Sequence, residues 1–146
     1  MADLYEVLLV EGDRRWHAGW VVDEDNDLLL RERGTLLLFD ARAGLEHYAQ
    51  EHHLKLLEGI PDEIDLHLGG WLTGSGPPPD VAEVSELWHL LYDDPKAGRR
   101  LASEELGEAY DDLVMEVPDW FAQHGEDAQV ALRESVELLL KDVRKG

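Results

Sequence analysis

Two pairs of histidine and carboxylate residues are the first places in this sequence where chemistry could occur. His47 and Glu51 are four residues apart and are followed by two more histidines, and His89 and Asp93 have the same spacing. On a helix this spacing brings both side chains of a pair to one face, where they could share a cation. The first run is one residue longer than the H-x-x-E-H zinc motif, and two ligands alone make a weak site. The sequence therefore predicts no metal site.

A second candidate is the acidic run Asp23–Asp27, which has aspartate at the first, third and fifth positions, as in an EF-hand calcium loop. Leu28 stands where that loop needs glycine for its sharp bend. Gly34 stands where a bidentate glutamate should close the site. We therefore expect a hairpin turn here, with weak adventitious calcium binding as the alternative.

Nucleophilic and acid–base catalysis have little support. The chain has no cysteine, and the run Thr73–Gly76 misses the G-x-S-x-G nucleophile elbow because threonine stands at the first glycine position. There is no P-loop and no G-x-G-x-x-G motif, and carboxylate pairs are too common in so acidic a chain to mark an active site. We expect no catalytic residues, no cofactor and no enzymatic activity.

Charge is the strongest functional signal. The chain has 33 Asp and Glu against 13 Lys and Arg, a formal net charge of −20 in 146 residues. Such a surface repels nucleic acid and anionic membranes and attracts basic proteins, so we expect a basic protein partner and no direct binding of DNA or RNA. A merely solubilising surface and adaptation to salt are the alternatives. No apolar run is long enough to cross a bilayer, and we expect a cytoplasmic protein.

Patterning predicts an α+β fold with a sheet-rich first half, residues 1–72. Short apolar or alternating runs separated by Gly and Asp residues are typical of an antiparallel meander of three to five strands. The period then lengthens, which indicates helices around one further strand. The expected strands cover residues 4–11, 16–22, 28–33, 35–39 and 54–57, and the expected helices cover residues 41–52 and 62–72.

The pattern of the second half, residues 80–146, predicts helices. It follows the segment 73–79, which is a Gly/Pro linker by composition. Asp80 and Ser103 are the expected N-caps of the first two helices, the second of which ends near Pro118. A last helix is expected over residues 127–143. We expect residues 1–146 to form a single domain with these helices packed against the sheet.

Five segments share a spacing of apolar residues: Trp16–Val22, Leu38–Asp40, Leu45–Ala49, Asp65–Leu72 and Leu87–Asp93. Over about residues 5–94 this spacing resembles that of small cytosolic bacterial proteins of toxin–immunity systems. His89 departs from it, since asparagine is expected at that position. The resemblance implies a non-enzymatic inhibitor that docks on a toxin and masks its active site.

The expected interface lies in residues 81–126, which have 12 acidic and 3 basic side chains, a net charge of −9. We expect acidic residues to steer a basic toxin or nuclease domain to this face, and an aromatic pair at its rim to anchor it. A DNA mimic or regulator that binds a nucleic-acid-binding protein is the alternative function, and the oligomeric state is left open. The predicted partner-binding residues are Asp93, Asp94, Glu104, Glu105, Glu108, Asp111, Asp112, Trp120 and Phe121.

Overall fold

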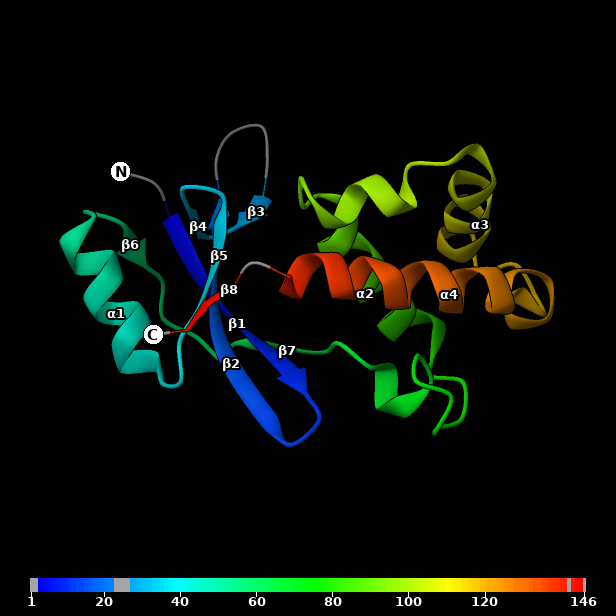
Figure 1. Ribbon diagram of the computed structural model, residues 1–146, viewed down its shortest axis with the longest axis horizontal. Helices are drawn as coiled ribbons and strands as arrows, with labels where there is room; N and C mark the ends of the chain where they lie inside the picture. The colour runs from blue at the N-terminus through cyan, green and yellow to red at the C-terminus, as the bar shows by residue number, and fades with distance from the viewer. Residues whose placement is uncertain (1–2, 23–26, 142, 146) are drawn as a thin grey trace. The chain divides into compact units, whose positions relative to one another are not determined.

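The computed structural model describes residues 3–22, 27–141 and 143–145 and has the predicted α+β fold, with several strands in its first half and a largely helical second half (Figure 1). The turn expected at Asp23–Asp27 lies largely outside the described residues. The chain forms two compact units. The first comprises Met1–Ile64 with Leu140–Gly146, and the second comprises Asp65–Leu139.

The main sheet of the first unit begins as the predicted antiparallel meander of β1 (Asp3–Glu11), β2 (Arg14–Val22) and β3 (Asp27–Leu29). It differs from the prediction in being mixed, because β6 (Lys55–Leu56) runs parallel to β1. The helix that precedes β6 allows this, since a parallel neighbour needs a long crossover. The strand order is β3-β2-β1-β6, and β7 (Asp62–Asp65) also pairs with β1.

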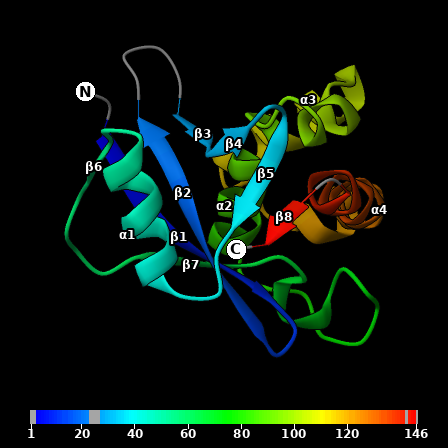
Figure 2. The ribbon, with the colours of Figure 1, turned by 60° about the vertical axis from the view of Figure 1, so that its left-hand side comes forward.

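A second, smaller sheet contains β4 (Arg31–Glu32), β5 (Thr35–Leu38) and β8 (Val143–Lys145). Both ribbon views show β8 beside β5, with which it pairs in parallel (Figure 1, Figure 2). The prediction that residue 143 belongs to the last helix is therefore wrong. Its apolar side chain fits a strand edge as well as a helix face, and only the long-range pairing with β5 decides between them.

Helix α1 (Arg42–Glu51) contacts β2 and β6 in the first unit, and Figure 2 shows it running along these strands. Its apolar stripe faces the core, because Leu45, Tyr48 and Ala49 are buried. They share a hydrophobic cluster with Leu4, Leu30, Leu37 and Phe39. The N-cap is Ala41, which has no side-chain capping hydrogen bond.

The second unit contains α2 (Val81–Tyr92), α3 (Glu104–Val114) and all of α4 (Trp120–Leu140) except its last residue, with the 3-10 segments η1 (Leu68–Gly70) and η2 (Ala97–Leu101). The helix expected over residues 62–72 is wrong, because residues 62–65 form β7. The φ angles of Gly69 and Gly70, 68° and 93°, are incompatible with a continuous α-helix in the rest of the segment. Helix α4 begins seven residues before the expected residue 127. None of the described helices is long and apolar enough to span a membrane.

An aromatic cluster forms much of the second unit's interior. The ring of Trp88 lies 5.7 Å from Tyr110 and 6.4 Å from Trp120, centroid to centroid. Phe121 contacts both Trp120 and Trp71 edge to face. Residues 73–79, the expected linker, lie within this unit, and the first part of the segment folds back on Gly70, whose carbonyl accepts backbone hydrogen bonds from residues 73, 75 and 76.

Candidate functional site

Helix α3 carries five of the predicted partner-binding residues on one side, and we call this set the acidic stripe: Glu104, Glu105, Glu108, Asp111 and Asp112. At 3.6 residues per turn these positions fall within an arc of about 120°. The opposite side of the helix holds the buried Leu106, Ala109 and Leu113. The helix therefore presents a continuous row of carboxylates because its apolar positions fix the other face in the core.

The N-terminus of α3 forms as the sequence predicts. Ser103 is the N-cap, and its hydroxyl accepts a hydrogen bond from the Leu106 N–H at 3.2 Å. Glu104 and Glu105 stand in the first turn, where the helix dipole favours negative charge. The acidic stripe is thus anchored at one end by a cap that positions its first carboxylates.

The C-terminal end of α3 has the opposite electrostatics. Asp111 and Asp112 lie in the last turn, next to the negative end of the helix dipole, and no basic residue stands there. Asp112 is partly buried and its Oδ2 lies 2.8 Å from His124 Nε2 on α4, whereas Asp111 is exposed. The negative charge of Asp111 therefore lowers the stability of its own helix. This favours a role for its carboxylate other than stabilising the fold.

Asp111 lies where the acidic stripe meets a groove between α2 and α3, which we call the α2–α3 groove. The groove has a volume of about 390 Å³. Its floor is largely apolar and aromatic, and carboxylates from both helices stand at its rim. The residues that line it are Trp88, His89, Tyr92, Asp93, Leu101, Leu106, Gly107, Tyr110 and Asp111.

The exposure of these side chains separates floor from rim. Trp88 is 1% exposed and closes the groove from below, whereas Tyr92 is 55% exposed at the end of α2. Asp93 is partly exposed, and its Oδ2 lies 3.2 Å from Nε2 of the exposed His89. Aromatic faces and carboxylates both attract cations, so this groove is suited to a positively charged side chain.

Two of the predicted partner-binding residues are buried instead. Trp120, expected at a rim, is 2% exposed, and its Nε1–H donates to the Ala109 carbonyl at 2.8 Å. Asp94 is 4% exposed, and its Oδ2 accepts hydrogen bonds from the N–H groups of Lys96 and Ala97. Neither side chain presents its functional group at the surface, because each satisfies backbone groups inside the second unit. Phe121, their predicted companion, is partly buried against Trp71.

Sequence reasoning singled out Asp93 and Asp111 but missed the groove that they border. The missing members are Trp88, Tyr92 and Tyr110. Tyr110 is only partly buried and Tyr92 is exposed. The available signal was that a tyrosine side chain combines an apolar ring with a polar tip, which favours a half-exposed position.

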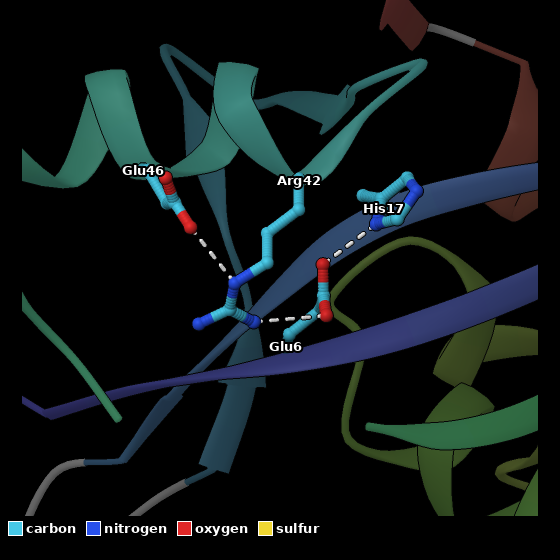
Figure 3. A network of polar contacts seen from close by, with 4 residues as sticks. All are labelled: Glu6, His17, Arg42 and Glu46. Atoms are coloured by element: carbon cyan, nitrogen blue, oxygen red, sulfur yellow. Dashed lines mark hydrogen bonds and ion pairs between the residues drawn. The ribbon is translucent and has the colours of Figure 1, made fainter. Parts of the chain in front are cut away.

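The first unit contains a separate polar network around Glu6, which is 8% exposed (Figure 3). Its Oε2 lies 2.6 Å from His17 Nδ1, and its Oε1 accepts a hydrogen bond from the Arg42 guanidinium at 3.0 Å. Arg42 also donates to Glu46 at 2.9 Å. Burial lowers the pKa of Arg42, but the hydrogen bonds and charges of Glu6 and Glu46 more than offset this, so its pKa is raised. The network ties α1 to β1 and β2.

A histidine oriented by a carboxylate is also a component of hydrolytic triads, so the Glu6 and His17 pair deserves that comparison. The first unit has no serine and no cysteine, and Thr35 is its one hydroxyl-bearing aliphatic side chain. Thr35 lies on β5 opposite Glu32, whereas the backbone of His17 pairs with Phe39, four residues further along the chain. The arrangement therefore favours a structural role for this buried carboxylate.

The histidines considered as metal ligands form two-residue ion pairs. His47 Nε2 lies 2.9 Å from Glu51 Oε1, and His89 pairs with Asp93 as described above. Among the described residues no group of three or more His, Asp or Glu side chains is placed to hold a metal ion. Each pair is consistent with an exposed i,i+4 contact on a helix.

No protein-family model and none of the curated proteins compared with this sequence matches it. Among solved structures, the crystal structure of the SatS C-terminal domain in complex with bromine is similar to this chain, with a TM-score of 0.64 and 12% sequence identity. The match covers 98% of this chain and 94% of that chain. At this identity the likeness shows an α+β fold shared with the SatS C-terminal domain.

Proposed function

We propose that this chain is an acidic, non-enzymatic binding protein that docks on a basic protein, and that it acts as an immunity-type inhibitor of a toxin. The observation that supports the proposal most strongly is the acidic stripe of α3, bordered by a groove with carboxylates of its own. The resemblance of residues 5–94 to immunity proteins agrees with it. The shape of the site adds to the charge, since a solubilising surface needs no groove.

The electrostatics support fast capture of a basic partner. Helix α3 has five acidic residues and no lysine or arginine between Glu104 and Val114. Like-signed charges on one face act together over roughly a Debye length, about 8 Å at physiological salt. They raise association rates with oppositely charged proteins, and an enzyme that cleaves nucleic acid needs a basic cleft. An acidic inhibitor can occupy such a cleft without any chemistry of its own.

The test uses the wild-type chain and a charge-reversed variant, Glu104→Lys with Glu108→Lys, as parallel baits in an extract of the source organism. Both residues are exposed, so the variant should fold normally. A matched control, Asp127→Lys with Glu137→Lys, makes the same change of charge on α4. We expect the wild type and the control to retain a basic protein that the stripe variant loses.

Kinetics and activity of the captured protein then complete the test. With the purified partner, the stripe variant should associate at least about tenfold more slowly at low salt, and added salt should reduce the difference. A toxin partner should lose its activity at one equivalent of wild-type protein. If the stripe variant associates as fast as the wild type, the acidic stripe is only a solubilising surface and the proposal is wrong.

A further inference from the structure

We propose that the α2–α3 groove is a receptor for a single arginine side chain of the basic partner. This inference rests on the proposed function and assigns a chemical class of ligand to one part of the interface. It is carried by two features that occur together in the groove. Aromatic rings line it, and two carboxylates border it, Asp93 directly after α2 and Asp111 in the last turn of α3.

The rings provide a surface for a flat, weakly hydrated cation. Trp88 and Tyr110 are 5.7 Å apart with an angle of 47° between their planes, so their faces are inclined to one another rather than stacked. Tyr92, 55% exposed, extends this aromatic surface toward solvent. A guanidinium group stacks on the accessible faces of these two tyrosines more readily than an ammonium group, because it is planar and less strongly hydrated.

The carboxylates supply the charge and the hydrogen-bond acceptors. Asp93 follows the last turn of α2 and Asp111 lies in the last turn of α3, and both line the groove. The contact of 3.2 Å with His89 orients the carboxylate of Asp93. A guanidinium has five N–H donors in a fixed plane, so it can donate hydrogen bonds to two carboxylates at once. The geometry of an ammonium group matches two carboxylates less well.

The volume of the groove fits a single inserted side chain better than a helix of the partner. A volume of about 390 Å³ lies near the lower end of the range for small-molecule pockets, which is about 300–1,000 Å³. It is too small for a helix, which is about 10 Å wide with its side chains. Leu101 and Leu106 line the groove beside the rings, and the aliphatic stem of an inserted arginine can pack against them.

The test is a titration of the full-length, isotope-labelled chain with short peptides, followed by NMR. One peptide has a single arginine, the second has citrulline in its place, which keeps the shape and removes the charge, and the third has lysine. We expect the arginine peptide to shift the backbone resonances of Gly107 and Tyr110 in a saturable way at millimolar concentrations. The citrulline peptide should leave them unchanged, and the lysine peptide should bind at least about threefold more weakly than the arginine peptide.

Variants separate the groove from the general acidity of the surface. Asp111→Asn and Tyr92→Leu should each weaken binding of the arginine peptide by about threefold to tenfold. Glu104→Gln, which removes the same charge from the first turn of α3, should change it by less than about twofold. Asp111 and Tyr92 are both exposed, so these variants should remain folded.

The outcomes distinguish this inference from the proposed function. If arginine and citrulline peptides behave alike, or if Glu104→Gln weakens binding as much as Asp111→Asn, the groove is not an arginine receptor. The acidic stripe can still bind a basic partner in that case, which the charge-reversed baits report separately. If the groove binds arginine but the stripe variant captures the same partner as the wild type, the groove inference stands and the proposed docking face is wrong.

Discussion

Replacement of Trp120 tests the distinction between a core residue and an interface anchor. Its side chain is 2% exposed and contacts the rings of Trp88 and Phe121. Truncation of a buried aromatic side chain leaves a cavity and costs about 3–5 kcal/mol, so Trp120→Ala should destabilise the second unit by that amount. If Trp120 stood at the rim of an interface instead, its truncation would change only the dissociation rate of a partner.

The Trp120→Phe variant isolates a smaller part of this stabilisation. It removes the Nε1–H that donates to the Ala109 carbonyl at 2.8 Å, but that carbonyl keeps its acceptor role within α3. The lost hydrogen bond should cost about 1 kcal/mol. A small cavity adds about 1 kcal/mol, which gives a total of about 2 kcal/mol.

Urea denaturation followed by far-UV circular dichroism measures both free energies of unfolding, since the second unit is helical. Met115→Ala is the control, because that side chain is 76% exposed and its loss should change stability by less than about 0.5 kcal/mol. Trp120→Phe should also leave the dissociation rate of a captured partner unchanged. A Trp120→Ala variant as stable as the control, or a Trp120→Phe variant that releases the partner faster while stable, would refute the burial argument.

Two further outcomes follow from individual contacts, and a third concerns metal. Asp94→Ala should lower the free energy of unfolding by about 2 kcal/mol in urea melts, because two backbone N–H groups lose a charged acceptor, whereas Asp93→Ala should change it by less than about 0.5 kcal/mol. The hydrogen bond from Arg100, 2.8 Å long, lowers the pKa of Glu134, so its stabilising effect is present above the pKa of an ordinary glutamate and is lost as pH falls through the lowered value. NMR titration should show this lowering in the wild type and its loss in Arg100→Gln. Finally, EDTA should leave the melting temperature unchanged, and a shift of several degrees would reveal a structural metal.

Local pattern was enough to predict the elements whose partners are close in sequence. The first two strands are joined by a tight turn at Gly12, and α3 is preceded by a side-chain cap at Ser103, so each is specified by residues within a few positions. The ends of α4 could not be predicted in this way. It starts at Trp120, whose ring is held by Trp88 on another helix, and the chain beyond Leu140 pairs with a strand more than 100 residues earlier.

The mixed sheet was missed for a related physical reason. An alternating apolar pattern indicates a strand but not the direction of its neighbour, and β6 has only Lys55 and Leu56 to report it. The burial of Glu6 was missed because a glutamate in a strand of alternating pattern is expected to face solvent. Its burial depends on Arg42, which is 36 residues away and reaches it from α1.

The candidate site shows why a count of charges cannot mark an interface by itself. Among the acidic residues of segment 81–126, Asp94 satisfies backbone N–H groups and Asp112 contacts His124, so both have structural partners. Glu108 and Asp111 are exposed, and Asp111 opposes the dipole of its own helix. Replacement of Asp111 by asparagine should therefore stabilise the folded chain by about 0.3–1 kcal/mol while it weakens the binding of cations to the α2–α3 groove. If the substitution raises the free energy of unfolding and weakens binding, the two opposite effects identify Asp111 as a binding residue. The net charge of the segment cannot make this distinction.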